Sequence, residues 1–316
     1  MSVLNRAYFS NEKAAFAYVE SILWPQGPVC PHCGGMDKAY KLEGVHTKAS
    51  EKNPEGVERF GLWKCGQNEC RKQFTVRKNT IFEESHCPLH KWLQAIHLMC
   101  SSKKGISAHQ MHRVLEVQYK TAWFLEHRIR EAMRSGDLAP FGGGGGPVEA
   151  DETFIGNERK KNPRSKGYQH KMKVLSLVDR NSGQARSMVV DNLKTATLLP
   201  ILQANIAKEA VLLTDDAGWY RTMGKHFAQH ESVNHVAGEY GRGPIHTNTI
   251  EGYFSIFKRG IKGVYQHCAK KHLHRYLAEF DFRYNHRIAN GYDDTARSSA
   301  ALLGVVGKRL TYRSAN

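Results

Sequence analysis

Apolar positions in the first 135 residues recur mainly at the three- to four-residue spacing of amphipathic helices. The pattern predicts a helix over 11–23, preceded by the good cap residues Ser10 and Asn11. It is absent between about 29 and 80, where short alternating runs favour strands. It returns over 89–135, where turns near 103–107 and 117–120 predict three successive helices.

From residue 147 onward the pattern mixes strands with helices. The first three strands form a predicted meander, because 179–183 is a good hairpin turn between the second and the third. The predicted strands are 147–155, 172–178, 184–190, 210–214 and 232–236, and the predicted helices are 196–208, 217–230, 248–262 and 271–288.

This order of elements predicts an α/β fold of the ribonuclease-H-like type, with a mixed sheet. In that fold the first and fourth strands are neighbours at the centre of the sheet, and the closing helix packs beside them. Residues at the ends of those two strands and on that helix would therefore converge.

Composition limits the class of protein and of partner. The 316 residues are 41% apolar and 24% charged, which is typical of globular protein. No run of 18 apolar residues occurs, so a spanning helix is excluded, and the N-terminus lacks a secretion signal, so we expect a cytoplasmic, nucleoid-associated protein. The net charge of +16 favours nucleic acid over membrane as the partner.

Four of the seven cysteines form two short pairs, Cys30 with Cys33 and Cys65 with Cys70. Two such pairs can close a tetrahedral zinc site, and the absence of an export signal argues against disulfides. We therefore predict one structural Zn²⁺ in a zinc ribbon. His32, His86 and Cys87 are alternative ligands, whereas Cys100 and Cys268 lie in apolar helical settings and are predicted core residues.

The three predicted helices of 89–135 have the outline of a helix-turn-helix DNA-binding unit. The last of them would be the recognition helix, and a plain helical bundle with a basic face is the alternative. Its basic residues are Lys120, Arg128, Arg130 and Arg134.

Gly142 to Gly146 form an unbroken glycine run between Pro140 and Pro147. Glycine buries no side chain and loses the most backbone entropy on ordering, so we predict a flexible joint. The predicted divisions are an N-terminal helix (1–28), the zinc ribbon (29–84), a helical domain (85–139), a linker (140–147), the ribonuclease-H-like catalytic domain (148–291) and a tail (292–316).

Three carboxylates occupy the positions that this fold would bring together. Asp151 lies inside the strand 147–155, Asp215 closes the apolar run that begins at Ala210, and Glu251 lies in the first turns of the helix 248–262. Carboxylates so placed can hold two divalent metal ions for phosphoryl transfer on nucleic acid.

Each of these carboxylates has a competing interpretation. An aspartate at a strand end can cap the next helix, and a glutamate in a first turn can interact with the helix dipole. An acid inside a strand, such as Asp151, is costly unless it is paired or metal-bound. Asp216 could replace Asp215, and Glu149 or Glu152 could replace Asp151.

The segment His246–Gly260, with Asn248, Glu251 and Lys258 inside it, and the following segment 271–285 resemble the bacterial insertion-sequence transposases related to the Merlin elements. Residues 148–156 and 212–215 resemble two other blocks of that family. The resemblance implies a zinc ribbon followed by a DDE domain on a ribonuclease-H-like core. It also implies a DNA transposase that acts on the terminal inverted repeats of its element.

The resemblance further implies that Asp151, Asp215 and Glu251 hold two Mg²⁺ or Mn²⁺ ions. Asn248 belongs to the same signature and is an alternative third ligand, but a carboxylate is the better hard ligand. Lys258, two helical turns after Glu251, could contact a phosphate. Further predicted backbone contacts are Lys262, Lys270, Lys271, Arg275 and Arg283.

The expected partner is double-stranded DNA, both element ends and target, bound by a homo-oligomer. Two other classes fit part of the pattern. A transposase-derived DNA-binding protein would have lost catalysis, and a metal-dependent DNA nuclease would cleave without joining.

Overall fold

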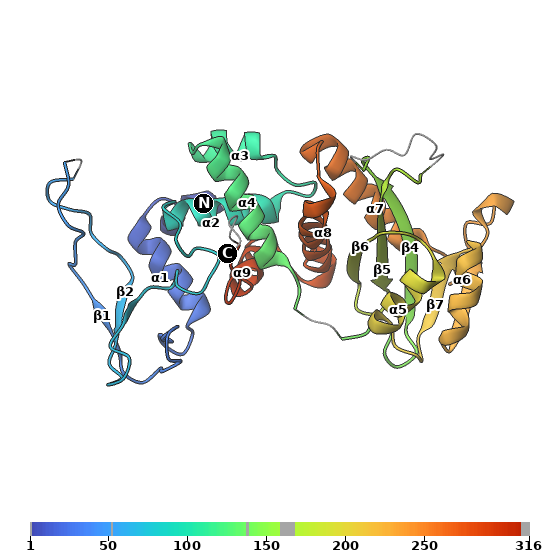
Figure 1. Ribbon diagram of the computed structural model, residues 1–316, viewed down its shortest axis with the longest axis horizontal. Helices are drawn as coiled ribbons and strands as arrows, with labels where there is room; N and C mark the ends of the chain where they lie inside the picture. The colour runs from blue at the N-terminus through green and yellow to red at the C-terminus, as the bar shows by residue number, and fades with distance from the viewer. Residues whose placement is uncertain (1, 52, 137–138, 159–167, 311–316) are drawn as a thin grey trace. The chain divides into compact units, whose positions relative to one another are not determined.

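The computed structural model describes residues 2–51, 53–136, 139–158 and 168–310 (Figure 1). The chain divides into two compact units. Unit 1 comprises Met1–Ser101, Ala108–Met133 and Asp294–Asn316, and unit 2 comprises Ser102–Ser107 and Arg134–Asp293. In the described part of the chain, no helix is both long enough and apolar enough to cross a membrane.

Unit 1 begins with a helix and a small antiparallel sheet that pack on each other. The sheet has the order β1-β2-β3 (Ala39–Leu42, Leu62–Cys65, Gln73–Phe74). Helix α1 (Glu12–Leu23) joins it through Glu20, which accepts a hydrogen bond from the Trp63 indole at 3.0 Å. Trp24 packs edge-on against Trp63 and Phe74. The N-terminal helix, predicted as a separate segment, therefore contacts the ribbon through Glu20 and through Trp24 at its C-cap.

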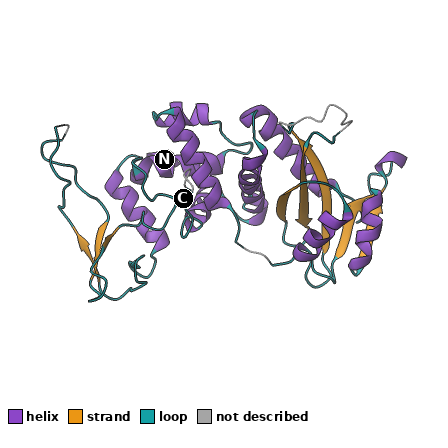
Figure 2. Ribbon diagram, viewed as in Figure 1, coloured by secondary structure: helices purple, strands orange, loops and turns teal. Residues whose placement is uncertain are grey.

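The rest of unit 1 is helical (Figure 2). Helices α2 (Leu89–Ser101), α3 (Ala108–Leu115) and α4 (Tyr119–Met133) confirm the predicted helices. The predicted tail contains a fourth helix, α9 (Asp294–Leu303), whose Ala301 and Leu302 are buried. Arg297 of α9 donates to the Cys100 carbonyl of α2 at 2.7 Å. Residues 311–316 of the tail lie outside the described residues.

Two arginines that were expected to face DNA on α4 instead lie inside unit 1. Arg128 donates to the carbonyls of Ile81 and Glu83, both at 2.7 Å, and Arg130 pairs with Glu126 at 3.1 Å. Arg128 is 4% exposed and Arg130 is fully buried. The expectation was wrong for these two because both side chains satisfy buried acceptors within unit 1.

We therefore expect Arg128→Met to destabilise the chain without a direct effect on DNA contacts. Two buried carbonyls would lose their donor, which costs about 1–3 kcal/mol for each group left unsatisfied. Urea denaturation would measure the loss, with Lys120→Ala on the exposed start of α4 as the control. Unchanged stability together with weaker DNA binding would contradict this role.

Unit 2 is built on a five-stranded mixed sheet of order β6-β5-β4-β7-β8. β4 (Pro147–Ile155), β5 (Met172–Asp179) and β6 (Gln184–Val190) form an antiparallel meander. β7 (Val211–Asp215) runs parallel to β4, and β8 (Gln229–Val233) runs parallel to β7. The mixed α/β architecture and the central β4–β7 pair are confirmed, and they are consistent with a ribonuclease-H-like fold.

Helices cover both faces of this sheet. On one face α5 (Thr195–Asn205) and α6 (Gly218–Met223) share a core with Val148 and Ala150 of β4. On the other face α7 (Asn248–Gly260) and α8 (Lys270–Asn285) share a core with Ile155. Because side chains alternate along a strand, the odd-numbered residues of β4 face α7 and α8.

The largest difference from the predicted boundaries lies between α6 and β8. The helix expected over 217–230 ends at Met223 and is followed by a short 3₁₀ turn (Gly224–His226), so that β8 begins three residues earlier than expected. A Cβ on Gly224 would lie 2.2 Å from the His230 ring. The chain therefore passes close to β8 at this glycine, where a larger residue would clash with His230.

The glycine run lies within unit 2 rather than between the two units. Gly142, at φ +75°, donates to Asp179 at 3.1 Å, and a Cβ there would lie 2.5 Å from that of Ala210. Phe141 is buried in the neighbouring core. Glycine permits a close backbone approach at Gly142 and Gly146, whereas residues 143–145 are exposed, and the run forms a turn that leads into β4.

Candidate active site and zinc centre

The four predicted cysteines meet in the ribbon. The sulfur atoms of Cys30, Cys33, Cys65 and Cys70 all lie within 4.8 Å of one another. The Cys30–Cys70 and Cys33–Cys65 sulfur distances are 3.7 and 3.6 Å. Four sulfurs bound to zinc at about 2.3 Å would stand at nearly this spacing.

Backbone geometry explains why the first cysteine pair chelates. Gly34, at φ +74°, donates to the Cys30 carbonyl at 2.8 Å, and the Cys30 N–H donates to Gly35 at 3.0 Å. This tight turn holds both sulfurs on one side. The alternative ligands His32, His86 and Cys87 are not part of the cluster. The donor set fits one structural Zn²⁺.

Asp151 and Asp215 belong to the two central parallel strands of unit 2. Glu149 pairs with Leu213 across β4 and β7, so the same register continued by two residues places Asp151 beside Asp215. Both then share the face that α7 covers. Asp216 instead forms an ion pair with Arg221 at 3.1 Å and accepts from Asn234 at 3.1 Å.

Glu251 projects from the first turn of α7. Its Oε1 accepts from the Thr247 hydroxyl at 3.1 Å and lies 3.3 Å from His235 Nε2. The side chain of Glu251 is 48% exposed, so an incoming ligand can reach it. Thr247 and His235 hold this carboxylate, and the sequence offered no signal for either.

The electrostatics show that these acids interact. Burial first, and then the charges of Glu152, Asp215 and Glu251, raise the pKa of Asp151 to about 8. Burial also raises the pKa of Asp215. Carboxylates crowded in this way are stabilised in their charged form by a cation.

The oxygen donors of these acids suit Mg²⁺ or Mn²⁺. Among the described residues, only the four-cysteine group already has its ligand atoms close enough to hold an ion. Mg²⁺ usually binds one or two carboxylates together with substrate phosphates, rather than a cage made of protein alone. The open arrangement of Asp151, Asp215 and Glu251 fits that mode.

The two competitors of Asp151 take other places. Glu152 faces the opposite side of the sheet, where it accepts from the Tyr220 hydroxyl of α6 at 2.7 Å. Burial first, with the charge of Asp215 adding to it, raises the pKa of Glu152 to about 7. Glu149 shares the face of Asp151 but is fully buried and paired with Arg180.

The remaining predicted residues of α7 lie on its exposed side. Asn248 begins the helix, and Lys258 lies two turns beyond Glu251 with its ammonium 5.8 Å from the Phe254 ring centre. Asn248, Glu251 and Lys258 are all solvent-exposed. Their spacing places Glu251 and Lys258 on one face of the helix.

The predicted basic track on α8 is shorter than expected. Arg283 is buried and pairs with Glu279, so its assignment as a backbone contact was wrong. Lys270 already pairs with Glu158 at 3.1 Å and with Asp191 at 2.9 Å. Lys262 and Lys271 remain exposed, and Arg275 is half-buried.

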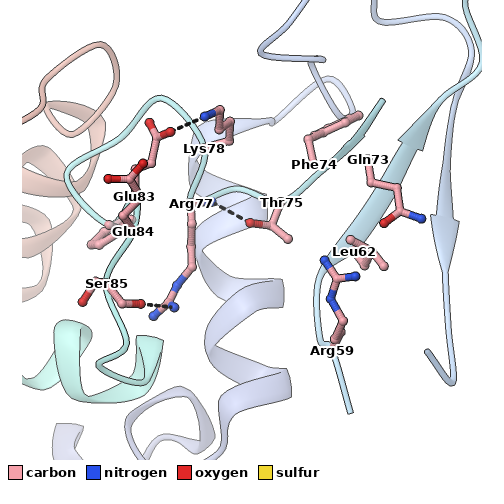
Figure 3. A pocket seen from close by; sticks show the side chains of 11 residues that line it. Arg59, Leu62, Gln73, Phe74, Thr75, Arg77, Lys78, Glu83, Glu84 and Ser85 are labelled. Atoms are coloured by element: carbon pink, nitrogen blue, oxygen red, sulfur yellow. Dashed lines mark hydrogen bonds and ion pairs between the residues drawn. The ribbon is translucent and has the colours of Figure 1, made fainter. Parts of the chain in front are cut away.

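A separate hollow of about 340 Å³ lies in unit 1 between the ribbon and the segment before α2 (Figure 3). Two of its basic side chains are already engaged, because Arg77 donates to the Ser85 carbonyl at 3.0 Å and Lys78 pairs with Glu83. The hollow therefore offers no free cationic site from these two residues.

Two family models match the chain. The ISXO2-like transposase domain matches residues 144–285, and the transposase zinc-ribbon domain matches residues 10–73. The first match contains Asp151, Asp215 and Glu251, and the second contains all four zinc-site cysteines. The second also begins ahead of α1, in agreement with the packing of that helix on the ribbon.

Individual proteins similar to this chain are also associated with transposition by name. A protein in transposable element ISH50 of Halobacterium salinarum is 28% identical over 295 residues, covering 87% of this chain and 91% of that relative. A transposase-like protein of Haemophilus influenzae is 26% identical over 99 residues, 31% of this chain and 79% of its own length.

Solved structures also align with the chain, among them a viral intasome. It is a simian T-cell lymphotropic virus intasome in complex with the PP2A regulatory subunit B56 gamma, at 12% identity and a TM-score of 0.28. The alignment covers 54% of this chain and 67% of that one. A likeness of this size carries no argument about fold or function.

Proposed function

We propose that this chain, which belongs to the insertion-sequence transposases with a zinc ribbon, binds the ends of its element and catalyses metal-dependent DNA cleavage and strand transfer. The observation that supports the proposal is the parallel register of β4 and β7, in which Glu149 pairs with Leu213 and which, extended by two residues, would bring Asp151 beside Asp215. Glu251 on α7 adds the third charge that Asp151 senses.

Asp151, Asp215 and Glu251 would hold two Mg²⁺ ions, which when bound activate an attacking oxygen and stabilise a leaving one. The protein's own groups prepare this site. Thr247 and His235 orient Glu251. Lys258, exposed on the same helix face, supplies a cation for a phosphate near the cut. Asn248, the first residue of α7, would act as a further oxygen donor.

The test is a joining assay with the gene's native flanking DNA on a plasmid. Purified protein, Mg²⁺ and a target plasmid should yield element ends covalently joined to target. Cleaved ends that never join would favour a nuclease. Binding of the flanks with neither cleavage nor joining would favour a DNA-binding protein derived from a transposase.

For the helical part of unit 1, we propose that DNA is contacted at the turn between α3 and α4 in helix-turn-helix fashion. Arg113, Tyr119 and Lys120 are exposed there, and His109 stacks on Tyr119 with ring centres 4.4 Å apart. We therefore propose the turn between α3 and α4, in place of the buried Arg128 and Arg130, as the surface that recognises DNA.

Replacing both Arg113 and Lys120 by alanine should weaken binding to the element ends by about tenfold or more. Each lost phosphate contact should also reduce the slope of log affinity against log salt by about 0.9. Fluorescence anisotropy at several salt concentrations measures both effects. Lys13→Ala on exposed α1 is the matched control. An unchanged slope would remove this surface from the proposal.

A further inference from the structure

Glu149 is a fully buried carboxylate two residues before Asp151 on the same face of β4. Its Oε1 accepts from Arg180 Nε at 2.6 Å, and its Oε2 accepts from the backbone N–H of Ile250 at 2.8 Å. His246 Nδ1 lies 3.5 Å from Oε1. Glu149 thus links the strand that carries Asp151 to the residue that precedes Glu251.

This link stands in for a local helix cap. The first N–H groups of a helix need acceptors, usually supplied by the N-cap side chain. The N-cap of α7 is Thr247, whose side chain makes no such bond, and its hydroxyl donates to Glu251. The Ile250 N–H is satisfied by Glu149 from across the fold, and its negative charge suits the positive end of the helix dipole.

Arg180 extends the connection to the segment before α7. Its Nη2 donates to the His246 carbonyl at 2.7 Å and its Nη1 donates to the Pro244 carbonyl. Its backbone N–H donates to Pro147, at the start of β4, at 3.1 Å. Strand β4, the loop ahead of α7 and the first turn of α7 are therefore joined through two side chains.

We propose that Glu149 and Arg180 are a positioning pair that sets the place of Glu251 relative to Asp151 and Asp215, and thereby sets the metal affinity of the acidic site. This inference rests on the proposed function. Glu251 follows Ile250 directly, so a shift of the first turn of α7 moves its carboxylate. Residues that orient metal ligands typically contribute 10- to 100-fold in metal affinity.

An ion pair that only stabilises the fold could have the same contacts as Glu149 and Arg180. Unit 2 contains a second buried ion pair that serves as a matched control for this alternative. Glu279 is also fully buried, accepts from Arg283 and from the Tyr265 hydroxyl, and lies on α8. Glu149→Gln and Glu279→Gln remove the same charge from comparable settings. Both should lower the melting temperature, but only Glu149→Gln should affect the metal site.

The experiment measures Mn²⁺ binding to the full, zinc-loaded chain by the electron paramagnetic resonance signal of free Mn²⁺, far below the melting temperature. We expect Asp151→Asn to abolish binding and Glu149→Gln to weaken it by about tenfold or more. Glu279→Gln should bind as wild type does. Arg180→Lys serves as a second variant if Glu149→Gln does not fold, because lysine lacks the planar fork that reaches several acceptors.

The outcomes separate the two ideas. If Glu149→Gln or Arg180→Lys binds Mn²⁺ as tightly as wild type while Asp151→Asn does not, the positioning pair is refuted and the proposed function stands. If Glu149→Gln and Glu279→Gln weaken binding equally, the effect is general destabilisation and the inference fails. If Asp151→Asn binds Mn²⁺ as tightly as wild type does, the acidic site is not the metal site. Both the positioning role and the proposed function then fail.

Discussion

Asp151→Asn is expected to abolish strand joining, lowering its rate by about 10³-fold or more while leaving binding to the element ends intact. A metal-stabilised transition state is worth several kcal/mol, and each 1.36 kcal/mol lost is a tenfold loss in rate. An amide supplies one neutral oxygen where the carboxylate supplied two charged ones. The joining assay and DNA-binding titrations measure the two effects separately.

The same substitution should not unfold the protein. The folded-state pKa of Asp151, about 8, lies above the ordinary value of 3.8, so the folded chain binds a proton that the unfolded chain has released at pH 7. Without Mg²⁺, the contribution of Asp151 to stability therefore falls as pH rises from 3.8 to about 8. Asparagine carries no such charge, so we expect this variant to melt no earlier than wild type at pH 7.

Asp216→Asn is the control for the neighbouring acid. Asp216 pairs with the exposed Arg221 and is not in register with Asp151. Joining should persist in this variant and should be lost in Asp215→Asn and Glu251→Gln. The prediction would be wrong if Asp216→Asn abolished joining and Asp215→Asn did not.

The sheet of unit 2 could be predicted from the sequence because its signal is local. Strand-like runs over β4, β5 and β6 and a good hairpin turn predict three strands in a meander. The parallel pairing of β4 with β7 followed from the order of elements and not from any residue. The earlier start of β8 and the shorter α6 were not predicted, and the close approach of Gly224 to His230 beside them is a tertiary contact that local periodicity does not report.

The burial of Arg128 and Arg283 could have been predicted from helical periodicity, although their charge suggested exposure to solvent. Arg128 is three residues after the buried Leu125 and therefore shares its helix face. Arg283 likewise follows Phe280 by three residues on α8. A basic residue on an apolar stripe indicates an internal partner. The partner itself, a carbonyl at Ile81 or the carboxylate of Glu279, needed the structure.

The acidic site was likewise predicted from the sequence only in part. Asp151, Asp215 and Glu251 are visible in sequence because each stands at a defined point of an element. Glu149 and Arg180 act through contacts that bridge up to 101 sequence positions. No local pattern reports such contacts, so Glu149 was considered only as a substitute for Asp151.

Removal of zinc, by chelation or by Cys65→Ser, is expected to unfold the ribbon and leave unit 2 folded. The ribbon's own core is small, with Cys30, Cys65 and Phe74 as its buried members and two tryptophans packed around them. A structural Zn²⁺ contributes about 10–16 kcal/mol of apparent binding energy, comparable to the whole stability of a typical domain. Without it, the pairing of β1, β2 and β3 cannot persist.

Hydrogen exchange across the full chain, read together with zinc content, tests this expectation. Protection should vanish over about 29–75 and remain in β4, β5 and β7, because unit 2 has its own two cores. Binding to the element ends should fall, while Mn²⁺ binding at Asp151 should not. Cys87→Ser removes a buried thiol outside the cluster and should retain one zinc per chain. A Cys65→Ser protein with full zinc and a protected ribbon would show that the four thiolates are not the ligands.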